Sequence, residues 1–238
     1  TDYNRSSAFV HTVMRETTHR FEATSSAGEV SAVLARPDSA RWLFVLGHGA
    51  GAGMQHPFMT RIAAELAERD VATFRYQFPY MEAGRRRPDH GPILLATVRS
   101  AVGAAMVLAG GLPVVAGGKS MGGRMASMAA ASEVIPGVRG IAFLGFPLHP
   151  AGKRGTERSE HLFDVGLPML FLQGDRDRLA DLELLRPVCG RLGSRAKLRI
   201  VEGGDHSFQV LKRSSRSGDE VMAELADAVR DWCEEVCG

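Results

Sequence analysis

A serine lies in a short glycine-rich turn between an apolar strand-like run, residues 113–116, and a helical segment that begins near Arg124. The turn reads GKSMG over residues 118–122, which is the G-x-S-x-G pattern of a strand-turn-helix nucleophile elbow. In so tight a turn, a Cβ two residues before or after the serine would clash, so glycine is needed at both places. The pattern predicts that Ser120 is a nucleophile at the carboxyl end of a strand, above the free N–H groups of a helix.

Two other interpretations compete for this segment. Gly-Lys-Ser also ends a phosphate-binding loop, but that loop requires a glycine at position 113, which is proline here. A G-x-S-x-G can also arise by chance in a chain with 27 glycines among 238 residues. The rest of a catalytic set must therefore decide whether the serine is functional.

Strand-like and helix-like segments alternate along the chain, which predicts βαβ units and a mainly parallel central sheet with helices on both faces. The absence of repeats and of a Pro/Ser-rich linker favours a single α/β domain over residues 1–238. The irregular segments 77–91 and 147–166 are expected to be substrate-facing loops. Strands are predicted at residues 18–23, 30–35, 42–46, 71–76, 113–116, 138–143, 168–173 and 198–201, and helices at 57–68, 93–108, 181–192 and about 219–235, besides the one after Ser120.

Composition limits the classes of partner and compartment. With 45% hydrophobic and 24% charged residues and a net charge of +2, the chain is typical of a globular protein and too mildly basic to indicate a nucleic-acid partner. The longest apolar stretch, residues 93–109, contains Arg99 and is expected to be a buried helix instead of a membrane span. Three cysteines without a C-x-x-C pair and a polar first segment predict free thiols, no signal peptide and a cytoplasmic location.

A carboxylate and a histidine follow two later predicted strands. Asp177 lies in GDRD after residues 169–172, and His206 lies in GGDHSF after residue 201. With Ser120 they give the order Ser, Asp, His, which is that of the α/β-hydrolases. A serine hydroxyl needs an imidazole to take its proton, and the imidazole needs a carboxylate to fix its tautomer. We therefore predict His206 as the base and Asp177 as the orienting acid.

Some alternatives to this assignment stay open. Asp175 is a rival for the acid, and His206 could be an ordinary surface histidine. His149 and His161 precede the acid and are expected to be solvated or substrate-lining instead of the base.

The segment GHGAGAG, residues 47–53, follows a predicted strand and could lend a backbone N–H to an oxyanion hole. The expected donors are the N–H groups of Ala50 and Met121. The same segment matches a dinucleotide fingerprint, G-x-G-x-x-A, but that fingerprint requires an acidic residue about 20 positions later. Residues 74–78, FRYQF, contain none.

Together, Ser120, Asp177, His206 and the His48-Gly49 loop resemble the α/β-hydrolase superfamily. Four blocks resemble more closely the small dienelactone-hydrolase-like group, typified by a testis-expressed protein and a subunit of the nonspecific-lethal chromatin complex. The resemblance implies a compact hydrolase without a large cap domain. Dienelactone hydrolases proper use a cysteine nucleophile, so lactone specificity is not implied for a chain with a serine there. The blocks are HGAGAGMQHPFM (48–59), FRYQFPYME (74–82), GGKSMGGR (117–124) and FPLHPAGK (146–153).

The resulting hypothesis is a serine hydrolase that cleaves small carboxylic esters or thioesters through an acyl-enzyme, without a metal or organic cofactor and without a nucleic-acid or membrane partner. The alternatives are a non-catalytic interaction domain, and a peptidase or acyltransferase with the same triad. Lys119 could serve an anionic substrate or point to solvent, and residues 85–87, three arginines, are expected to be a solvated loop instead of an anion clamp. A partly apolar substrate pocket is expected from His48, Phe78, Tyr80, Phe146, Leu148 and Phe208.

Overall fold

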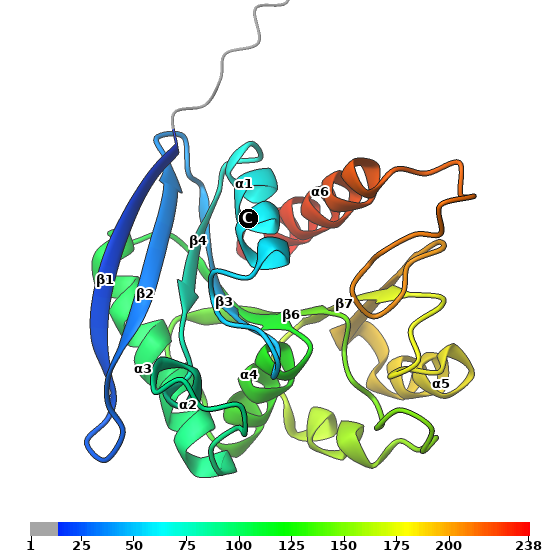
Figure 1. The fold of residues 1–238 in the computed structure, drawn as a ribbon, viewed down its shortest axis with the longest axis horizontal. Helices are drawn as coiled ribbons and strands as arrows, with labels where there is room; N and C mark the ends of the chain where they lie inside the picture. The colour runs from blue at the N-terminus through cyan, green and yellow to red at the C-terminus, as the bar shows by residue number, and fades with distance from the viewer. Residues whose placement is uncertain (1–13) are drawn as a thin grey trace, which may run out of the picture.

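Largely apolar segments form the inner strands of a central sheet in this computed structural model, which describes residues 14–238 (Figure 1). Every residue is buried in β3 (Trp42–Gly47), β4 (Val71–Tyr76), β5 (Val114–Lys119) and β7 (Met169–Gly174). A strand that is apolar on both sides needs cover on both faces of its sheet. The predicted mainly parallel sheet with helices on both faces is therefore confirmed.

The sheet has eight strands in the order β1-β2-β4-β3-β5-β6-β7-β8. Strands β3 to β8 are mutually parallel, whereas β2 is antiparallel to both β1 and β4. Because the parallel strands share one direction, the turns that follow β5, β7 and β8 open at the same edge of the sheet. The remaining strands are β1 (Met14–Thr24), β2 (Gly28–Pro37), β6 (Val138–Leu144) and β8 (Ala196–Val201).

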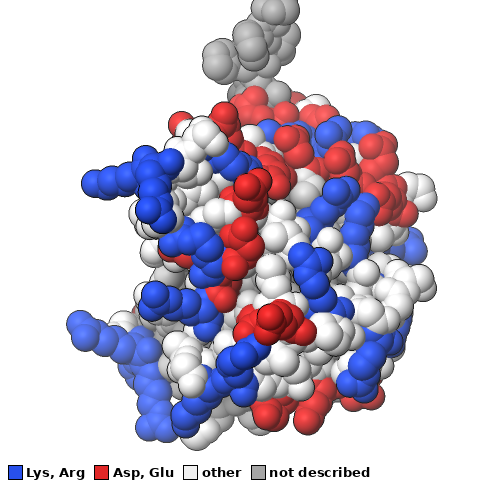
Figure 2. Space-filling view, turned by 90° about the vertical axis from the view of Figure 1, so that its right-hand side faces the viewer, with Lys and Arg blue, Asp and Glu red and all other residues white. Residues whose placement is uncertain are grey.

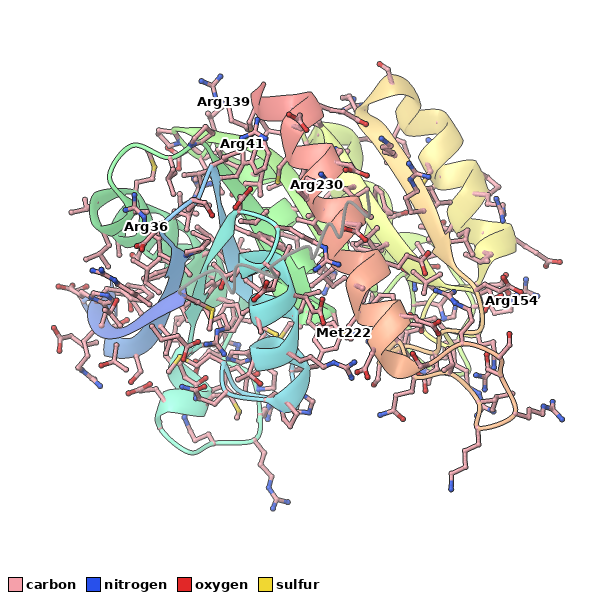
Figure 3. All side chains as sticks on the ribbon, turned by 90° about the horizontal axis from the view of Figure 1, so that it is seen from above. Arg36, Arg41, Arg139, Arg154, Met222 and Arg230 are labelled. Atoms are coloured by element: carbon pink, nitrogen blue, oxygen red, sulfur yellow. The ribbon has the colours of Figure 1, made fainter. Side chains whose placement is uncertain are left out.

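Two hydrophobic layers separate along the alternating faces of each strand. In β3, Phe44 and Leu46 pack with α1 (Pro57–Ala67) and α6 (Gly218–Cys237). Leu43 and Val45 belong to the opposite layer, which contains α3, α4 and α5. Figure 3, in which Met222 and Arg230 mark α6, shows α6 beside α1 on one face of the sheet. The helices of the other layer are α3 (Gly91–Ala109), α4 (Met121–Ser132) and α5 (Leu182–Leu192).

Most predicted elements are present, with ends that differ by a few residues. The first hairpin is longer than predicted, and β5 continues to Lys119, directly before the serine. The segments expected to be irregular contain short helices: α2 (Pro79–Glu82), and the 3₁₀ helix η1 (Glu157–Asp164). A third short helix, η2 (Gly193–Arg195), precedes β8. The prediction of one domain over residues 1–238 includes residues outside the described part of the chain and stays a prediction.

The apolar stretch 93–109 forms α3, which packs against β1 and α4. Of the helices within residues 14–238, this one alone has the length and mean hydropathy, 1.7, of a membrane span. Its inner face lies in the core, and its outer end is apolar and exposed, since Val107 is 83% exposed. The expectation of a buried helix therefore holds for one face of α3 only.

Charged side chains cover the face of the molecule shown in Figure 2. Acidic side chains gather toward the top of that view and recur along its bottom edge, and basic ones lie along its left and lower-left edges. Both signs occur side by side, so this face carries no continuous basic surface.

Candidate active site

Ser120 occupies the turn between β5 and α4 in a strained backbone conformation, with φ 51° and ψ −112°. Its N–H donates a hydrogen bond to the carbonyl of Leu144 in β6, 3.2 Å away. The two glycines of the motif both approach the carbonyl oxygen of Gly47 in β3. A Cβ would lie 2.1 Å from that oxygen at Gly118 and 2.2 Å from it at Gly122. The close approach of β3 to the turn is thus the physical reason for both glycines.

His206 bridges Ser120 and Asp177. Its Nε2 lies 2.9 Å from the hydroxyl oxygen of Ser120, and its Nδ1 lies 2.7 Å from Oδ2 of Asp177. A carboxylate only accepts, so Nδ1–H donates to Asp177 and the Nε2 lone pair is left to accept the serine proton. The three residues follow β5, β7 and β8, whose carboxyl ends meet at one edge of the sheet. This arrangement can move a proton from the serine hydroxyl to the imidazole.

The side chain of Asp177 is fully buried, at 0% exposure, whereas that of His206 is 25% exposed. Two further donors hold the carboxylate: the side-chain amide of Gln173, and the N–H of Leu179 at 2.7 Å. The rival acid, Asp175, is exposed and accepts instead from the N–H of Gly203, at 2.9 Å. The structure therefore brings Asp177, and not Asp175, to the histidine.

Gln173 was not among the predicted site residues. It lies at the end of β7, fully buried, where its amide oxygen accepts from the N–H of Phe146 at 2.9 Å while its amide nitrogen donates to Asp177. A polar residue that ends an otherwise apolar strand just before GDRD is the sequence signal that could have identified it.

The loop after β3 runs alongside Ser120, and Gly49, Ala50 and Gly51 share a cavity wall with the serine. The N–H of Ala50 finds no hydrogen-bond partner within the described chain, while its carbonyl accepts from the hydroxyl of Tyr80 at 2.7 Å. Met121 is the first residue of α4, so its N–H is one of those that a helix leaves without an internal partner. Neither of the two predicted oxyanion donors is used in a backbone hydrogen bond within the described residues.

His48 holds this loop from behind. Its Nδ1–H donates to the carbonyl of Gly49 at 2.8 Å, and its Nε2 accepts from the N–H of Phe78 at 3.1 Å. Burial lowers the pKa of His48 to about 4, so the ring is neutral at pH 7 and can keep one donor and one acceptor nitrogen. The side chain of Gln77 adds a third anchor by accepting from the N–H of Met54 at 2.8 Å.

A cavity of about 300 Å³ opens in front of the serine. Apolar groups from the first turn of α1 form one wall, and the loops that carry Ser120 and His206 form the others. The lining residues are Gly49, Ala50, Gly51, Ala52, His56, Phe58, Met59, Lys119, Ser120, His206 and Ser207.

The six residues predicted to line a substrate pocket are not among them, and all six are buried. His48, Phe78 and Tyr80 lie behind the loop after β3, where they bond to its backbone or pack on one another. Phe146 and Leu148 belong to the core, and Phe146 packs against Phe143 and Phe171. Phe208 stacks on Phe58 with ring centroids 6.0 Å apart. The structure differs from this expectation because the chain that follows β3, β4, β6 and β8 turns back into the core before it reaches the surface.

The residues that line the cavity instead come from segments for which the sequence predicted other roles. Phe58 and Met59 lie within the helix predicted at residues 57–68, and the N-terminal turn of α1 places both in the cavity wall. Lys119, for which the sequence left open a role toward an anionic substrate or a position in solvent, lines the cavity. The apolar periodicity of α1 does not show where its first turn points.

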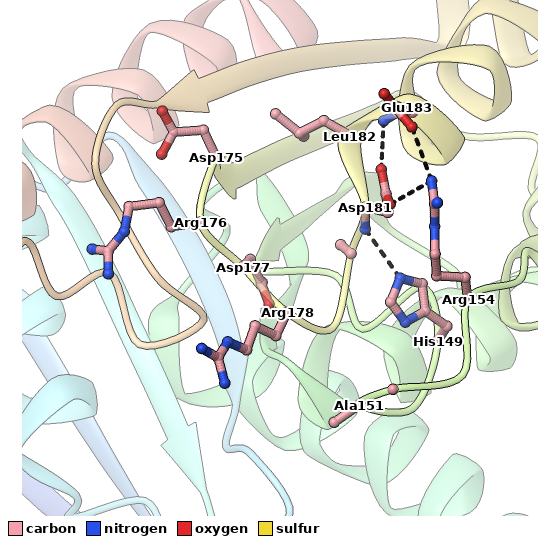
Figure 4. Close-up of a pocket in the computed structure, with 12 residues that line it drawn as sticks. His149, Ala151, Arg154, Asp175, Arg176, Asp177, Arg178, Asp181, Leu182 and Glu183 are labelled. Carbon is pink, nitrogen blue, oxygen red and sulfur yellow. Dashed lines mark hydrogen bonds and ion pairs between the residues drawn. The ribbon is translucent and has the colours of Figure 1, made fainter.

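A second, larger hollow of about 750 Å³ lies beside the loop that carries Asp177 (Figure 4). Three of its charged groups pair with one another, since Arg154 lies 2.6 Å from Asp181 and 2.9 Å from Glu183. His149 accepts from the N–H of Asp181 at 3.1 Å. This histidine therefore supports a loop and faces neither the serine nor its cavity.

The remaining sequence candidates lie elsewhere. His161 is hydrogen-bonded to Ser127 of α4 at 2.8 Å, and Arg85 pairs with Asp89 at 2.6 Å in an exposed loop. Within residues 14–238, no group of three or more His, Cys, Asp or Glu is placed to hold a metal ion. The three cysteines, Cys189, Cys233 and Cys237, are free thiols.

Comparison with known proteins identifies the family and the fold. The family described as an alpha/beta hydrolase domain matches residues 40–234. A dienelactone hydrolase from Anabaena variabilis has a similar structure, with a TM-score of 0.72 and 18% identity over 94% of this chain and 98% of the other. An alpha-beta serine hydrolase homologue from Coxiella burnetii gives a TM-score of 0.71 at 18% identity, over 92% and 98% of the two chains. An α/β serine hydrolase without lid from Xanthomonas campestris gives 0.69 at 18% identity, over 92% and 95%. At this identity the solved structures establish the fold.

The elbow geometry predicts opposite effects for two glycine-to-alanine substitutions. Gly122→Ala places a methyl group 2.2 Å from a backbone oxygen and should lower the free energy of unfolding by about 3 kcal/mol or more. Gly103→Ala, at an exposed position inside α3 with open space around it, should raise it by about 0.5–1 kcal/mol. Urea denaturation of both variants measures the difference, and equal effects would contradict the steric account of the elbow.

The neutral state of His48 predicts a pH-dependent stability. Its pKa in the folded protein, about 4, lies below the ordinary histidine value of 6.5, so the unfolded chain binds more protons between these pH values, and stability is lost as the pH falls from 6.5 toward 4. When the pH is lowered from 8 to 5, protonation of this group should lower the free energy of unfolding by about 2 kcal/mol. Urea denaturation at pH 8 and at pH 5 measures this loss of stability. The loss should be about 2 kcal/mol smaller in His48→Gln than in the wild-type protein. Equal losses in the two proteins would mean that His48 titrates normally.

Proposed function

Because the chain belongs to the α/β-hydrolase family whose model spans residues 40–234, we propose that it is a serine hydrolase that cleaves small carboxylic esters or thioesters. The observation that carries the proposal is the hydrogen-bonded series from Ser120 through His206 to Asp177, at 2.9 and 2.7 Å. These residue types, in this order and at these distances, suit nucleophilic acyl transfer. The strained backbone of Ser120 supports the same role, since such strain clusters at functional sites.

In the proposed reaction, the Ser120 oxygen attacks the carbonyl carbon of the ester while Nε2 of His206 takes the hydroxyl proton. Asp177 stabilises the imidazolium that forms. Collapse of the tetrahedral intermediate breaks the bond to the leaving alcohol or thiol, which receives the proton from His206. A water molecule, deprotonated by the same imidazole, then attacks the acyl-enzyme, releases the carboxylic acid and restores the serine.

The N–H groups of Ala50 and Met121 are the proposed donors to the oxyanion of each tetrahedral intermediate. A preorganised donor of this kind contributes about 3 kcal/mol to transition-state stabilisation. The two donors come from different elements, the loop after β3 and the first residue of α4. The contacts that Tyr80 and His48 make with the loop support the proposal, because they hold one donor in place before substrate binds.

The proposed substrate class follows from the size and lining of the cavity. Its volume of about 300 Å³ and its partly apolar wall, with Phe58 and Met59, suit a short acyl group. In the residues described, the cavity in front of Ser120 is open to solvent beside His206, whose side chain is 25% exposed. A leaving group can therefore depart, and water can enter, on that side.

We also propose that the chain belongs with the small dienelactone-hydrolase-like group of the testis-expressed protein and the nonspecific-lethal complex subunit. Its support is that the first three of the four blocks meet at the site: residues 48–59 border the cavity, 74–82 hold the loop, and 117–124 form the elbow. A single domain over residues 1–238 and a cytoplasmic location belong to the same proposal, the latter supported by the free thiols.

A fluorophosphonate should label the wild-type protein once, at Ser120, because only an activated serine displaces its fluoride, and the phosphonyl adduct resembles the tetrahedral intermediate. Ser120→Ala and His206→Ala should abolish the adduct and lower kcat on 4-nitrophenyl butyrate by about 10⁴-fold or more. Intact-mass and peptide-mapping spectrometry measure the adduct, and nitrophenolate release measures turnover.

Ser132→Ala is the matched control, because that serine lies exposed at the far end of the same helix. It should keep both labelling and turnover. Neither adduct nor turnover in the folded wild-type protein would reject the hydrolase proposal in favour of a non-catalytic interaction domain with the same fold.

Tyr80→Phe tests the proposed oxyanion loop without touching the cavity. The substitution removes the hydroxyl that donates to the carbonyl of Ala50, so the donor should be held less firmly and kcat should fall about 10-fold. The KM should change by less than about 3-fold, since the ring stays buried in place. Steady-state kinetics on the same ester separate the two constants, and an unchanged kcat would mean that this anchor does not hold the donor.

A further inference from the structure

The ammonium group of Lys119 is buried beside the catalytic residues and has no hydrogen-bond partner within the described chain. Lys119 ends β5, directly before the serine, and only 9% of the residue is exposed. It contributes to the wall of the cavity that contains Ser120 and His206. The proposed acyl-transfer mechanism gives this ammonium no task. A buried charge without a partner is costly, so its presence at this place calls for an explanation.

Two aromatic rings and a glycine enclose the ammonium. It lies 5.9 Å from the ring centroid of Phe58 and 5.6 Å from that of Phe208, near the outer limit of a cation–π contact. A Cβ at Gly145 would lie 3.2 Å from Nζ, and that glycine has a φ of 77°. The enclosure is therefore shaped around the lysine side chain, but it supplies only weak stabilisation of the charge.

The nearby carboxylates, Asp177 and Asp205, act on the ammonium at a distance and do not bond to it. Asp177 accepts from Gln173, from His206 and from the N–H of Leu179. Asp205 accepts from the N–H groups two and four residues further along the chain, at 2.8 and 2.9 Å. Both acids are thus engaged by other donors, and the lysine alone keeps its hydrogen-bonding capacity unused.

Burial lowers the pKa of Lys119 to about 8, which leaves most of the molecules protonated at pH 7. A protonated amine with three unused donors, next to a cavity, is completed by an anionic acceptor. A carboxylate that enters the cavity would bring such an acceptor.

We infer that Lys119 is a specificity-determining residue that binds a carboxylate carried by the substrate, so that the preferred esters are half-esters of short dicarboxylic acids. This inference rests on the proposed hydrolase function, because it assigns a substrate class to the same cavity. The ion pair holds the far end of the substrate while the ester carbonyl lies at Ser120. Charge-assisted hydrogen bonds in a partly desolvated site orient as well as bind.

The kinetic test uses a matched pair of substrates, mono-4-nitrophenyl adipate and its methyl-capped diester, which differ in one negative charge. The quantity measured is the ratio of kcat/KM for the anionic ester to that for the neutral ester. Lys119→Met should lower this ratio about 10- to 100-fold, which corresponds to the loss of one charged hydrogen bond. Lys153→Met removes the same charge from an exposed loop position and should change the ratio less than about 2-fold.

A binding measurement tests the inference without turnover. Calorimetry should detect adipate binding to Ser120→Ala, and the affinity should fall about 10- to 100-fold when Lys119→Met is added. Circular dichroism and thermal unfolding check that the variants are folded. Lys119→Gln is the second neutral variant, for use if the methionine variant does not fold.

A ratio that stays the same in the folded Lys119→Met protein would overturn the inference, and so would an equal loss on both esters, which would indicate a purely structural lysine. Failure of the hydrolase proposal looks different, because the wild-type protein would then neither turn over the neutral diester nor react with the fluorophosphonate. In that case adipate binding alone decides: binding that depends on Lys119 supports the carboxylate site, and no binding rejects it.

Discussion

The close approach of three backbone segments at the carbonyl of Gly47 is the constraint on which the site depends. Strand β3, the end of β5 and the start of α4 come so near each other there that Gly118 and Gly122 have no room for a Cβ. This proximity bends the chain sharply at Ser120 and leaves it with a positive φ. It also brings the loop after β3 against the serine. One steric contact therefore positions the nucleophile and the loop that carries a proposed oxyanion donor.

Buried polar side chains hold the parts of the site that backbone geometry leaves free. Gln173 ties the carboxylate of Asp177 to the backbone of the neighbouring loop, and His48 ties the loop after β3 to the N–H of Phe78. Each makes one hydrogen bond as a donor and one as an acceptor, which requires an amide or a neutral imidazole. The low pKa of His48 is thus part of its structural role. Such paired bonds keep buried polar groups satisfied while they fix orientation.

Lys119 breaks that rule, since its buried ammonium is left without a partner in the described chain. The two carboxylates that act on this ammonium, those of Asp177 and Asp205, are engaged by other donors, and this contrast is what singles out the lysine. Structural charges are paired within the fold, whereas an unpaired charge at a cavity wall is held ready for a ligand. Arg154, an exposed basic side chain at the larger hollow, lacks this feature because it already has two carboxylate partners.

Local patterns in the sequence were sufficient for the alternation of strands and helices, the elbow around Ser120 and the order of Asp177 and His206. Each depends on residues that are close in the chain: apolar periodicity, the spacing of glycines, and polar residues that directly follow strands. The tertiary structure decided which side chains reach the cavity. Phe78 and Tyr80 turn inward to hold a loop, and the first turn of α1 supplies Phe58 instead. It also decided between Asp175 and Asp177, two residues apart on one turn. The reason is that a side chain's direction at the end of a strand depends on what packs against it from distant segments, and no local pattern records those contacts.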